Sequence, residues 1–398
     1  MRILLITHIF PPSVDGGSKI IYKLGNYLSR YHQVQCLTTD CRTTDDFVTP
    51  GSAPVISGND SYPVYRLPVY KTLRKSFKLL SLITNNIPYL TDLFSIAQTG
   101  PVFKPFSFIK TVISLYRFRP QVIIAGPFPT AVPLYAFFLA KLFNSRLVVV
   151  PCFHENDIAF HSRPLISVLK NSRLICTLTK HEIKYLKKRY RLNDFNFFLL
   201  QAGIDSDFLI KKDPIPPKNP NLLFLANFSA HKRAEILIKA FVRLATDFPR
   251  LSLTLAGQET LYLPKIKELI ETLPVSISSR IKLVVGKYDQ KLEKKFLSRS
   301  SILVLPSVHE SFGMVFIEAW ARKKPVIGAG IPAVTELITK ARGGLIFKTD
   351  NLTELVSSIR QLLNHPKLSR RLALSGYNYV KNNLVWDTIG DRLCQKLQ

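Results

Sequence analysis

Short apolar runs alternate with segments of helical apolar spacing along this chain, and a proline-rich stretch interrupts the alternation once. Before that stretch, the apolar run at residues 2–7 is followed by helical spacing at 19–29, and further apolar runs follow at 33–38 and 121–125. After the stretch, the pattern resumes at residue 221. Strands that alternate with helices form parallel sheets covered on both faces. The sequence therefore predicts an α/β fold of two Rossmann-like domains that face a central cleft, with ligand bound at the carboxyl ends of the strands.

The proline-rich stretch at residues 201–220 is typical of a linker, so we expect an N-terminal domain over 1–200 and a second domain over 221–380. Near the end of the chain, apolar residues recur at helical spacing, namely at Trp386, Ile389, Leu393 and Leu397. This pattern predicts a final helix over 381–398 that packs back on the N-terminal domain.

The five cysteines are scattered without the spacing of metal ligands, which indicates reduced thiols and neither a disulfide framework nor a metal site. Residues 1–6 pass directly into an apolar strand pattern that is too short for a secretory leader. The apolar region at 122–143 is interrupted by glycine and prolines, which favours a strand, a turn and a buried helix over a membrane span. We therefore expect a cytoplasmic protein.

The chain carries 55 Lys and Arg against 27 Asp and Glu, a formal net charge of +28, which indicates an anionic partner. Residues 61–119 contain nine basic side chains with Asp92 as the only acid, and their apolar residues recur at helical spacing. Basic amphipathic helices suit the cytoplasmic face of an anionic membrane, which is the partner we expect for residues 71–94. For residues 109–116, ordinary helices with a solvated basic face are an equal alternative. No nucleic-acid-binding motif is present, so nucleic acid is not an expected partner.

Two carboxylates stand eight positions apart in residues 307–318, and a Phe-Gly turn lies between them. The preceding run at 302–305 is typical of a buried strand, and the segment after Gly313 is typical of a helix. Glu310 would then follow the strand, and Glu318 would lie in the second helical turn. The unpaired amides of a helix start attract anions and hydroxyls. Either glutamate alone is explained more simply as a helix cap or a solvated residue, but the pair around the turn favours a ligand site.

This segment and its surroundings resemble the GT-B-fold retaining glycosyltransferases of the GT4 type, or glycosyl transferases group 1. The resemblance spans nearly the whole chain and is strongest over residues 222–347. It is carried by the Glu310–Glu318 spacing, by Lys324-Pro325-Val326-Ile327 with Gly343-Gly344, and by the Pro11-Pro12 to Gly16-Gly17 loop. It implies the GT-B fold, with an acceptor-side N-terminal domain and a nucleotide-sugar-binding C-terminal domain.

By this resemblance, Glu318 would bind the ribose of the nucleotide and Glu310 would lie beside the donor sugar as a catalytic residue. The backbone amides of Phe312, Gly313 and Met314 would contact sugar hydroxyls, and Val315 would begin the diphosphate pocket.

In the first domain, the resemblance places Gly16 and Gly17 against the diphosphate and the acceptor. Glycine allows such a close approach because it has no side chain. His154 matches the catalytic histidine that the family has near the transferred sugar.

The family also has a Gly-Arg pair and a lysine that bind the diphosphate, at the first strand–helix turn of the second domain. Lys232 matches the lysine, but Ala226-Asn227 stands in place of Gly-Arg. Asn227 therefore occupies the place of one cation in the donor site, and Arg233 and His231 are the two candidates to compensate. Arginine and lysine differ in geometry, so the replacement bears on the strength of diphosphate binding.

The resemblance implies a metal-independent enzyme that moves a sugar from a UDP- or GDP-linked donor to a glycan or lipid-linked acceptor, with retention at the anomeric carbon. The nucleotide sugar would be a co-substrate, and no cofactor is expected. The pathway implied is the synthesis of cell-envelope polysaccharide or glycolipid. Two alternatives remain open from the sequence: a nucleotide-sugar epimerase on the same fold, and a non-enzymatic anion- or membrane-binding protein on an inactive transferase scaffold.

Overall fold

The structure is a computed structural model that describes residues 1–11, 16–43, 45–47, 61–71, 74–212, 219–286 and 290–398. It contains two compact units. The first comprises Met1–Gln201 and Gly390–Gln398, and the second comprises Ala202–Ile389. Residues 12–15 of the expected glycine loop and 213–218 of the expected linker lie outside the described residues.

The first unit is built on a seven-stranded sheet of parallel strands in the order β3-β2-β1-β4-β5-β6-β7. In chain order the strands are β1 (Arg2–Ile6), β2 (Gln33–Thr39), β3 (Val64–Leu67), β4 (Val122–Ala125), β5 (Arg146–Val149), β6 (Leu174–Thr177) and β7 (Phe197–Leu199). The strand order reverses between β1 and β4, the kind of position at which doubly wound sheets bind ligands.

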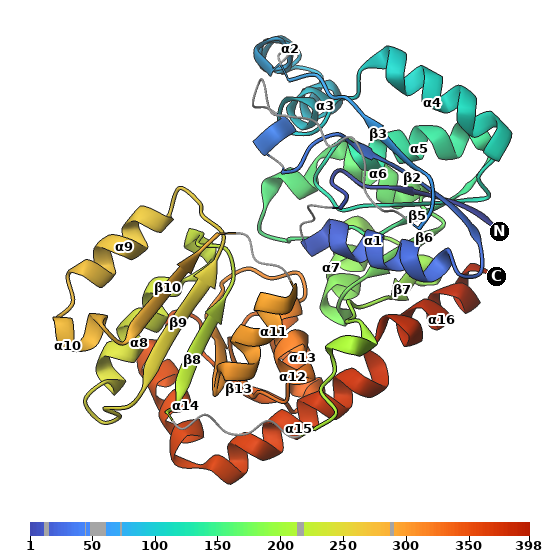
Figure 1. Ribbon diagram of the computed structural model, residues 1–398. Helices are drawn as coiled ribbons and strands as arrows, with labels where there is room; N and C mark the ends of the chain where they lie inside the picture. Colours follow the sequence, from blue (N-terminus) through green and yellow to red (C-terminus); the bar gives the residue numbers. More distant parts are fainter. Residues whose placement is uncertain (12–15, 44, 48–60, 72–73, 213–218, 287–289) are drawn as a thin grey trace. The chain divides into compact units, whose positions relative to one another are not determined.

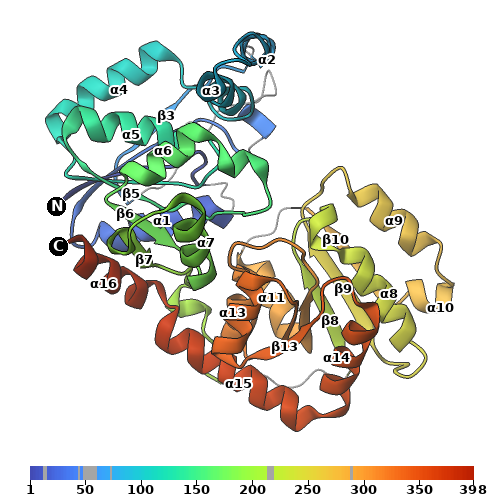
Figure 2. The same ribbon diagram turned by 180° about the vertical axis from the view of Figure 1, so that it is seen from behind.

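Helices cover both faces of this sheet, as Figures 1 and 2 show. The helices are α1 (Gly16–Leu28), α2 (Arg74–Ile83), α3 (Pro88–Thr99), α4 (Pro105–Phe118), α5 (Val132–Phe143), α6 (Arg163–Asn171) and α7 (Lys180–Tyr190). Helix α7 begins at Lys180, because the Thr179 hydroxyl accepts a hydrogen bond from the amide of Glu182 at 3.0 Å and caps the helix. Helices α1 and α7 lie on one face, and α5 and α6 lie on the other (Figure 1).

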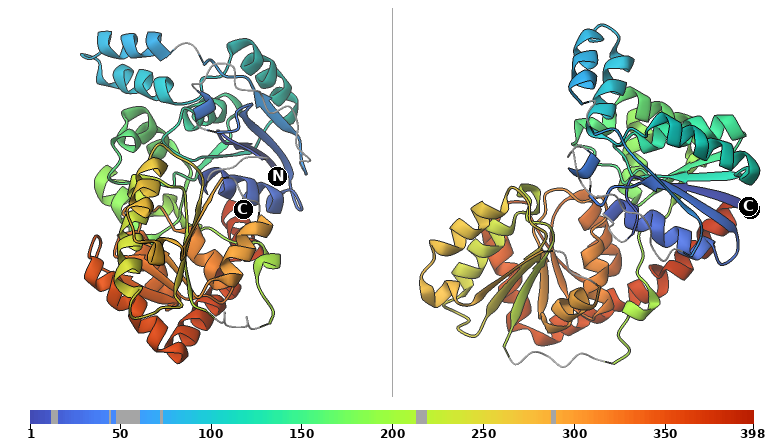
Figure 3. Two further views of the ribbon diagram at one scale, coloured as in Figure 1. Left: turned by 60° about the vertical axis from the view of Figure 1, so that its left-hand side comes forward. Right: turned by 45° about the horizontal axis from the view of Figure 1, so that its top comes forward.

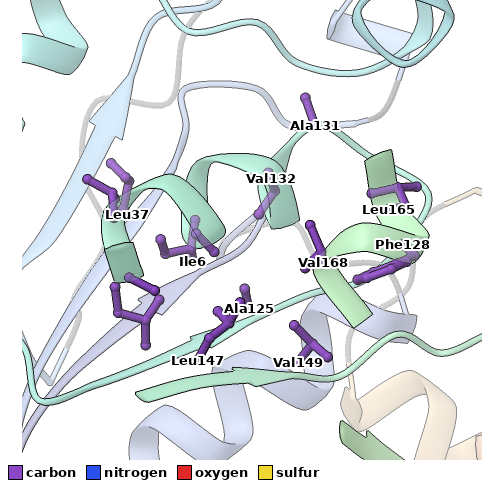
Figure 4. Packing of buried hydrophobic residues seen from close by; sticks show 14 of the residues in the cluster. Ile6, Leu37, Ala125, Phe128, Ala131, Val132, Leu147, Val149, Leu165 and Val168 are labelled. Carbon is purple, nitrogen blue, oxygen red and sulfur yellow. The ribbon is translucent and has the colours of Figure 1, made fainter. Parts of the chain in front are cut away.

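The apolar strands of the first sheet pack against the helices through fully buried aliphatic side chains (Figure 4). The labelled members of this core are Ile6, Leu37, Ala125, Phe128, Ala131, Val132, Leu147, Val149, Leu165 and Val168. Burial of each large aliphatic side chain contributes about 1.5–3 kcal/mol. The core therefore holds the strands in place, and the loops at their carboxyl ends start from fixed positions.

The second unit is built on a six-stranded parallel sheet in the order β10-β9-β8-β11-β12-β13. Its strands are β8 (Asn221–Leu225), β9 (Ser252–Gly257), β10 (Ile281–Val285), β11 (Ile302–Leu305), β12 (Val326–Ala329) and β13 (Gly344–Phe347). Its helices are α8 (Ala234–Leu244), α9 (Leu263–Glu271), α10 (Val275–Ser278), α11 (Gln290–Arg299), α12 (Met314–Ala321), α13 (Pro332–Ala341), α14 (Leu352–Asn364) and α15 (Pro366–Asn383), and α16 (Trp386–Leu397) begins here and ends in the first unit. Here the strand order reverses between β8 and β11.

Two parallel α/β units confirm the expected α/β fold class. The apolar region at residues 122–143 forms β4, a turn and α5, as the sequence predicts. No helix in the described part of the chain is long and apolar enough to cross a membrane.

The span over residues 61–119 contains more structure than its amphipathic pattern indicates. It forms β3 and three helices, of which α2 and α3 pack against each other through the stacked rings of Phe77 and Phe94, 6.4 Å apart. Figure 3 shows these two helices side by side at the periphery of the first unit.

Candidate functional site

Two loops meet at the carboxyl edge of the second sheet, where its strand order reverses. One follows β8 and carries Asn227 to Arg233, and the other follows β11 and carries Ser307 to Gly313. Because β8 and β11 are hydrogen-bonded neighbours, both loops leave the sheet side by side. The amide of Val308 donates to the carbonyl of His231 at 2.9 Å and joins the two loops directly.

The structure brings together two residues that the sequence places 78 positions apart, Lys232 and Glu310. The Lys232 ammonium donates to a Glu310 carboxylate oxygen at 2.5 Å, and the two side chains are only 18% and 12% exposed. A charge-assisted contact in a partly buried place is stronger than an exposed ion pair. Glu310 thus holds the Lys232 ammonium between the two loops, at the carboxyl edge of the second sheet.

Gly313 forms the start of α12 through a backbone that L side chains rarely adopt. Its φ is +87°, and a Cβ atom at this position would approach the Phe316 ring to 2.6 Å. Glycine is therefore required both by conformation and by space. The turn leaves the first amides of α12 without intrahelical acceptors, as at any helix start.

The remaining residues between Glu310 and Glu318 lie in the turn before α12 or in its first two turns. Phe312 is buried, and Met314 and Val315 are partly buried in the first helical turn. Glu318 is in the second turn, as its position in the sequence predicts, and is only 6% exposed. A buried carboxylate needs hydrogen-bonding partners. Its burial excludes the simpler interpretation of Glu318 as a solvated helical residue.

Asn227 and Arg233 lie on the same loop as Lys232 but have other partners than Glu310. Asn227 is exposed, and its carbonyl accepts from the amide of Ser229 at 2.9 Å. The Arg233 guanidinium pairs with Glu235 at 3.5 Å and with Asp350 at 3.2 Å. The structure therefore engages Arg233 with other acids and does not bring it to Glu310.

Two further residues of this edge were not singled out from the sequence. Ser307 is 1% exposed, and its hydroxyl has no hydrogen-bond partner among the described residues. His309 lies beside His231, with their ring centroids 6.4 Å apart. A buried hydroxyl without a partner is uncommon. The one available signal was position, because both residues stand between the strand at 302–305 and the predicted Glu310.

In the first unit, Gly16 and Gly17 form the first turn of α1, after β1. A Cβ at Gly17 would approach the Pro127 ring to 2.6 Å, whereas nothing lies within 4 Å of a Cβ at Gly16. Gly17 is therefore explained by packing against the loop after β4. Gly16 is exposed and leaves backbone open to a ligand.

His154 lies in the loop after β5, at the same carboxyl edge of the first sheet as the loop after β1. Its ring contacts Phe160, with centroids 5.2 Å apart. The loop is tied to the start of α7 by Glu182, which is 5% exposed. Its carboxylate accepts from the amides of Phe153 at 3.0 Å and Leu178 at 2.8 Å.

A second contact fastens the same loop. The His181 ring lies 2.9 Å from the Glu155 carboxylate. The sequence places Thr179 and Glu182 at the spacing of a capping box, but only the structure shows that Glu182 also reaches across to Phe153. Glu182 is thus a positioning residue that sequence reasoning missed.

No group of three or more His, Cys, Asp or Glu side chains that could hold a metal ion occurs among the residues the structure describes. Positive charge at the second sheet's edge comes instead from Lys232 and from the amides at the start of α12.

Residues 205–379 match the family model described as glycosyl transferases group 1. An uncharacterized glycosyltransferase of Methanocaldococcus jannaschii is 30% identical over 315 residues, which cover 76% of this chain and 80% of that protein. A glycogen synthase of Mycobacterium tuberculosis is 22% identical over 410 residues and covers 99% of this chain and 94% of its own length.

Solved structures share the fold along the whole chain. A sucrose-phosphate synthase from Thermosynechococcus elongatus has a TM-score of 0.76 at 17% identity, with 99% of this chain and 98% of that chain covered. The Anabaena protein HepE, in complex with UDP and glucose, has a TM-score of 0.73 at 14% identity, with 100% and 99% covered. The glycosyltransferase WaaG, which is involved in lipopolysaccharide biosynthesis, has a TM-score of 0.67 at 13% identity, with 99% and 98% covered.

Proposed function

Because this chain belongs to the glycosyl transferases group 1 family, we propose that it moves a sugar from a UDP- or GDP-linked donor to a glycan or lipid-linked acceptor. One observation carries the proposal, namely the Lys232–Glu310 pair at the start of α12. This edge offers a cation and helix-start amides for a diphosphate, and carboxylates for sugar and ribose hydroxyls. The UDP bound by the structurally similar HepE supports a nucleotide-sugar donor.

We assign the residues of the donor site as follows. The diphosphate would displace Glu310 from the Lys232 ammonium and take hydrogen bonds from the amides at Met314 and Val315. Glu310, once released, would accept from hydroxyls of the donor sugar together with Phe312 and Gly313. Glu318 would accept from the ribose. Asn227 would contribute a neutral amide at the place where the family has a cation.

The reaction breaks the bond between the anomeric carbon and the diphosphate oxygen, and the electron pair leaves with the nucleoside diphosphate. The acceptor oxygen bonds to the same carbon on the same face, and its proton passes to the leaving phosphate. The positive charge at Lys232 and at the start of α12 stabilises the charge that develops on the diphosphate. We propose that this charge makes a metal ion unnecessary, so EDTA should not reduce the rate of transfer.

The first unit would supply the acceptor side. Gly16 leaves backbone open at the start of α1, and His154 stands at the same sheet edge on a loop held by Glu182. We propose that His154 contacts the sugar as it is transferred and that the backbone at Gly16 and Gly17 contacts the diphosphate and the acceptor.

A thermal-shift and hydrolysis panel tests the donor proposal. The wild-type protein should be stabilised by UDP or by GDP and should slowly hydrolyse one of the matching sugar nucleotides. Glu318→Ala should lose the stabilisation because the ribose acceptor is gone. No response of the wild-type protein to any nucleoside diphosphate would refute the proposal. Release of an epimerised sugar nucleotide without acceptor would favour an epimerase instead.

We also propose that the protein lies on the cytoplasmic face of an anionic membrane, which fits an acceptor in cell-envelope polysaccharide or glycolipid synthesis. The hairpin of α2 and α3 exposes large apolar side chains, with Leu79, Leu82 and Ile83 at 59%, 63% and 66% exposure. The basic balance of the surrounding span adds attraction to anionic headgroups.

Sedimentation with vesicles tests the membrane proposal. The wild-type protein should pellet with phosphatidylglycerol vesicles and less with phosphatidylcholine vesicles. The double variant Leu82→Glu/Ile83→Glu should remain in the supernatant. Phe195→Glu is the matched control, because Phe195 is 90% exposed in the same unit but outside the hairpin. Equal pelleting of the double variant and the wild-type protein would count against the hairpin as the contact.

A further inference from the structure

A cavity lies at the amino edge of the second sheet, opposite the edge that carries Lys232 and Glu310. It has a volume of about 530 Å³, within the range of roughly 300–1,000 Å³ that small-molecule sites occupy. Its walls come from the amino ends of β8, β11 and β12, from the end of α14 and from α15. The strands of a parallel sheet all begin at one edge, so this cavity is distinct from the proposed donor site.

The walls of the cavity are mainly aliphatic. The apolar lining consists of Ile302, Leu362, Leu363, Ala373 and Leu374, with three prolines at positions 220, 325 and 366. Such a lining favours an aliphatic chain because burial of each CH₂ group contributes about 0.8 kcal/mol.

The charged lining residues are all basic, namely Lys323, Lys324 and Arg370, and no acidic residue lines the cavity among the residues the structure describes. Lys324 is the distinctive one, because it is only 4% exposed. Burial, together with the charge of Arg322, lowers the pKa of Lys324 to about 8. A buried ammonium costs free energy unless an anion compensates it.

We propose that this cavity binds a small amphiphile made of a carboxylate and an aliphatic chain, with the carboxylate on Lys324 and the chain between α14 and α15. The aliphatic walls favour such a molecule over a sugar or a nucleotide, and the basic charge favours a carboxylate over a neutral head group. The proposal does not depend on the identity of the donor or the acceptor.

Lys324 also closes the end of α12. Its backbone amide donates to the carbonyl of Ala319 at 2.9 Å, so the residue that meets the ligand belongs to the turn that ends this helix. The ligand and the proposed nucleotide would therefore lie at opposite ends of α12, and each can be measured without the other.

Calorimetric titration with octanoate, below the concentration at which it forms micelles, tests the proposal. Octanol supplies the same chain without charge, and acetate supplies the carboxylate without the chain. Octanoate should bind about tenfold or more tightly than octanol, as one charge-assisted contact implies, and acetate should bind more weakly than both.

Three variants locate the ligand. Lys324→Met should bind octanoate no better than octanol. The control variant Lys367→Met should behave as the wild-type protein, because Lys367 is an exposed lysine of α15 that does not line the cavity. Ser369→Trp should fill the cavity and abolish binding of both chains. An unchanged response to UDP or GDP, or an unchanged circular dichroism spectrum, shows that each variant is folded. Equal binding of octanoate and octanol, or full octanoate binding by Lys324→Met or by Ser369→Trp, would overturn the proposal.

Discussion

A glutamate lies at the carboxyl edge of each sheet, and the two glutamates have different kinds of partner. In the second unit, Glu310 meets the side chain of Lys232, so the pair consists of two groups that a ligand can separate. In the first unit, the Glu182 carboxylate accepts from the backbone amides of Phe153 and Leu178 and so holds a loop in place. One edge therefore pairs its acid with a side-chain cation, whereas the other edge uses its acid to fix the loop that carries His154.

The largest expected effect comes from removing the cation of the exchangeable pair. Lys232→Met should weaken UDP or GDP binding by roughly 10–150-fold, because a hydrogen bond to a charged group contributes about 1.5–3 kcal/mol. Calorimetric titration measures the change. Lys340→Met is the matched control, since Lys340 also pairs with a glutamate, Glu336, at 2.7 Å on α13. Unchanged nucleotide affinity in Lys232→Met would remove the distinction between the two edges.

The next effect separates turnover from nucleotide binding. Glu182→Gln should lower kcat by about tenfold, because glutamine has a single acceptor oxygen and can hold only one of the two backbone amides, so the loop at His154 shifts. Nucleotide affinity should not change, since neither Glu182 nor the loop that it holds is among the residues proposed to bind the nucleotide. Kinetics of sugar transfer, compared with nucleotide titration, measure both. Glu155→Gln, which affects the second tie of the same loop, serves as the control. A parallel loss of nucleotide affinity would show that Glu182 has only a general structural role.

A smaller effect is expected on stability, and it should differ between a glycine of the second unit, Gly313, and a glycine of the first, Gly16. Gly313→Ala should lower the free energy of unfolding of the second unit by about 1–3 kcal/mol, because its φ of +87° is strained for alanine and its Cβ would meet Phe316. Gly16→Ala should change stability by less than about 1 kcal/mol, because a Cβ there meets nothing within 4 Å. Thermal unfolding measures both. Equal losses would mean that Gly16 is also needed for folding and not for a ligand's approach.

The last effect depends on pH and concerns a lysine at the other edge of the second sheet, where Lys324 has no carboxylate in ion-pair contact within the described chain. Its folded-state pKa of about 8 lies below its usual value of 10.5, so the unfolded chain binds the extra proton between these values. Stability of the wild-type protein should therefore rise with pH from 8 to 10.5. Relative to it, Lys324→Met should be more stable at pH 7, and the difference should shrink over that window. A constant difference in melting temperature would contradict the lowered pKa.

The sequence predicted the second unit more completely than the first because its signals are local. The spacing of Glu310 and Glu318 around Gly313 follows directly from a strand, a turn and a helix start, and the structure has α12 starting one residue after that glycine. The structure also explains the motif glycines Gly343 and Gly344, since a Cβ on either would collide with Trp320 or with the Val326 carbonyl.

The features that the sequence did not reveal depend on contacts between distant residues. Nothing near Glu182 indicates that it reaches Phe153, and nothing near Arg233 indicates that Asp350 engages it. Strand β3 was missed because it has four residues and pairs only with β2 at the edge of the sheet. Helix α3 was missed because its apolar residues are divided between two partners, with Phe94 against α2 and Ile96 in the core of the first unit.

The path of α16 has a consequence for how the protein is made. The helix starts in the second unit, and its residues from Gly390 onward pack on the first, where a Cβ at Gly390 would lie 2.2 Å from the Tyr27 ring and Arg146 donates to the carbonyl of Leu397 at 2.5 Å. Domains emerging from a ribosome usually fold in order of synthesis. Here the first unit stays incomplete until residues Gly390–Gln398 have been made, so its final consolidation waits for the synthesis of the second unit.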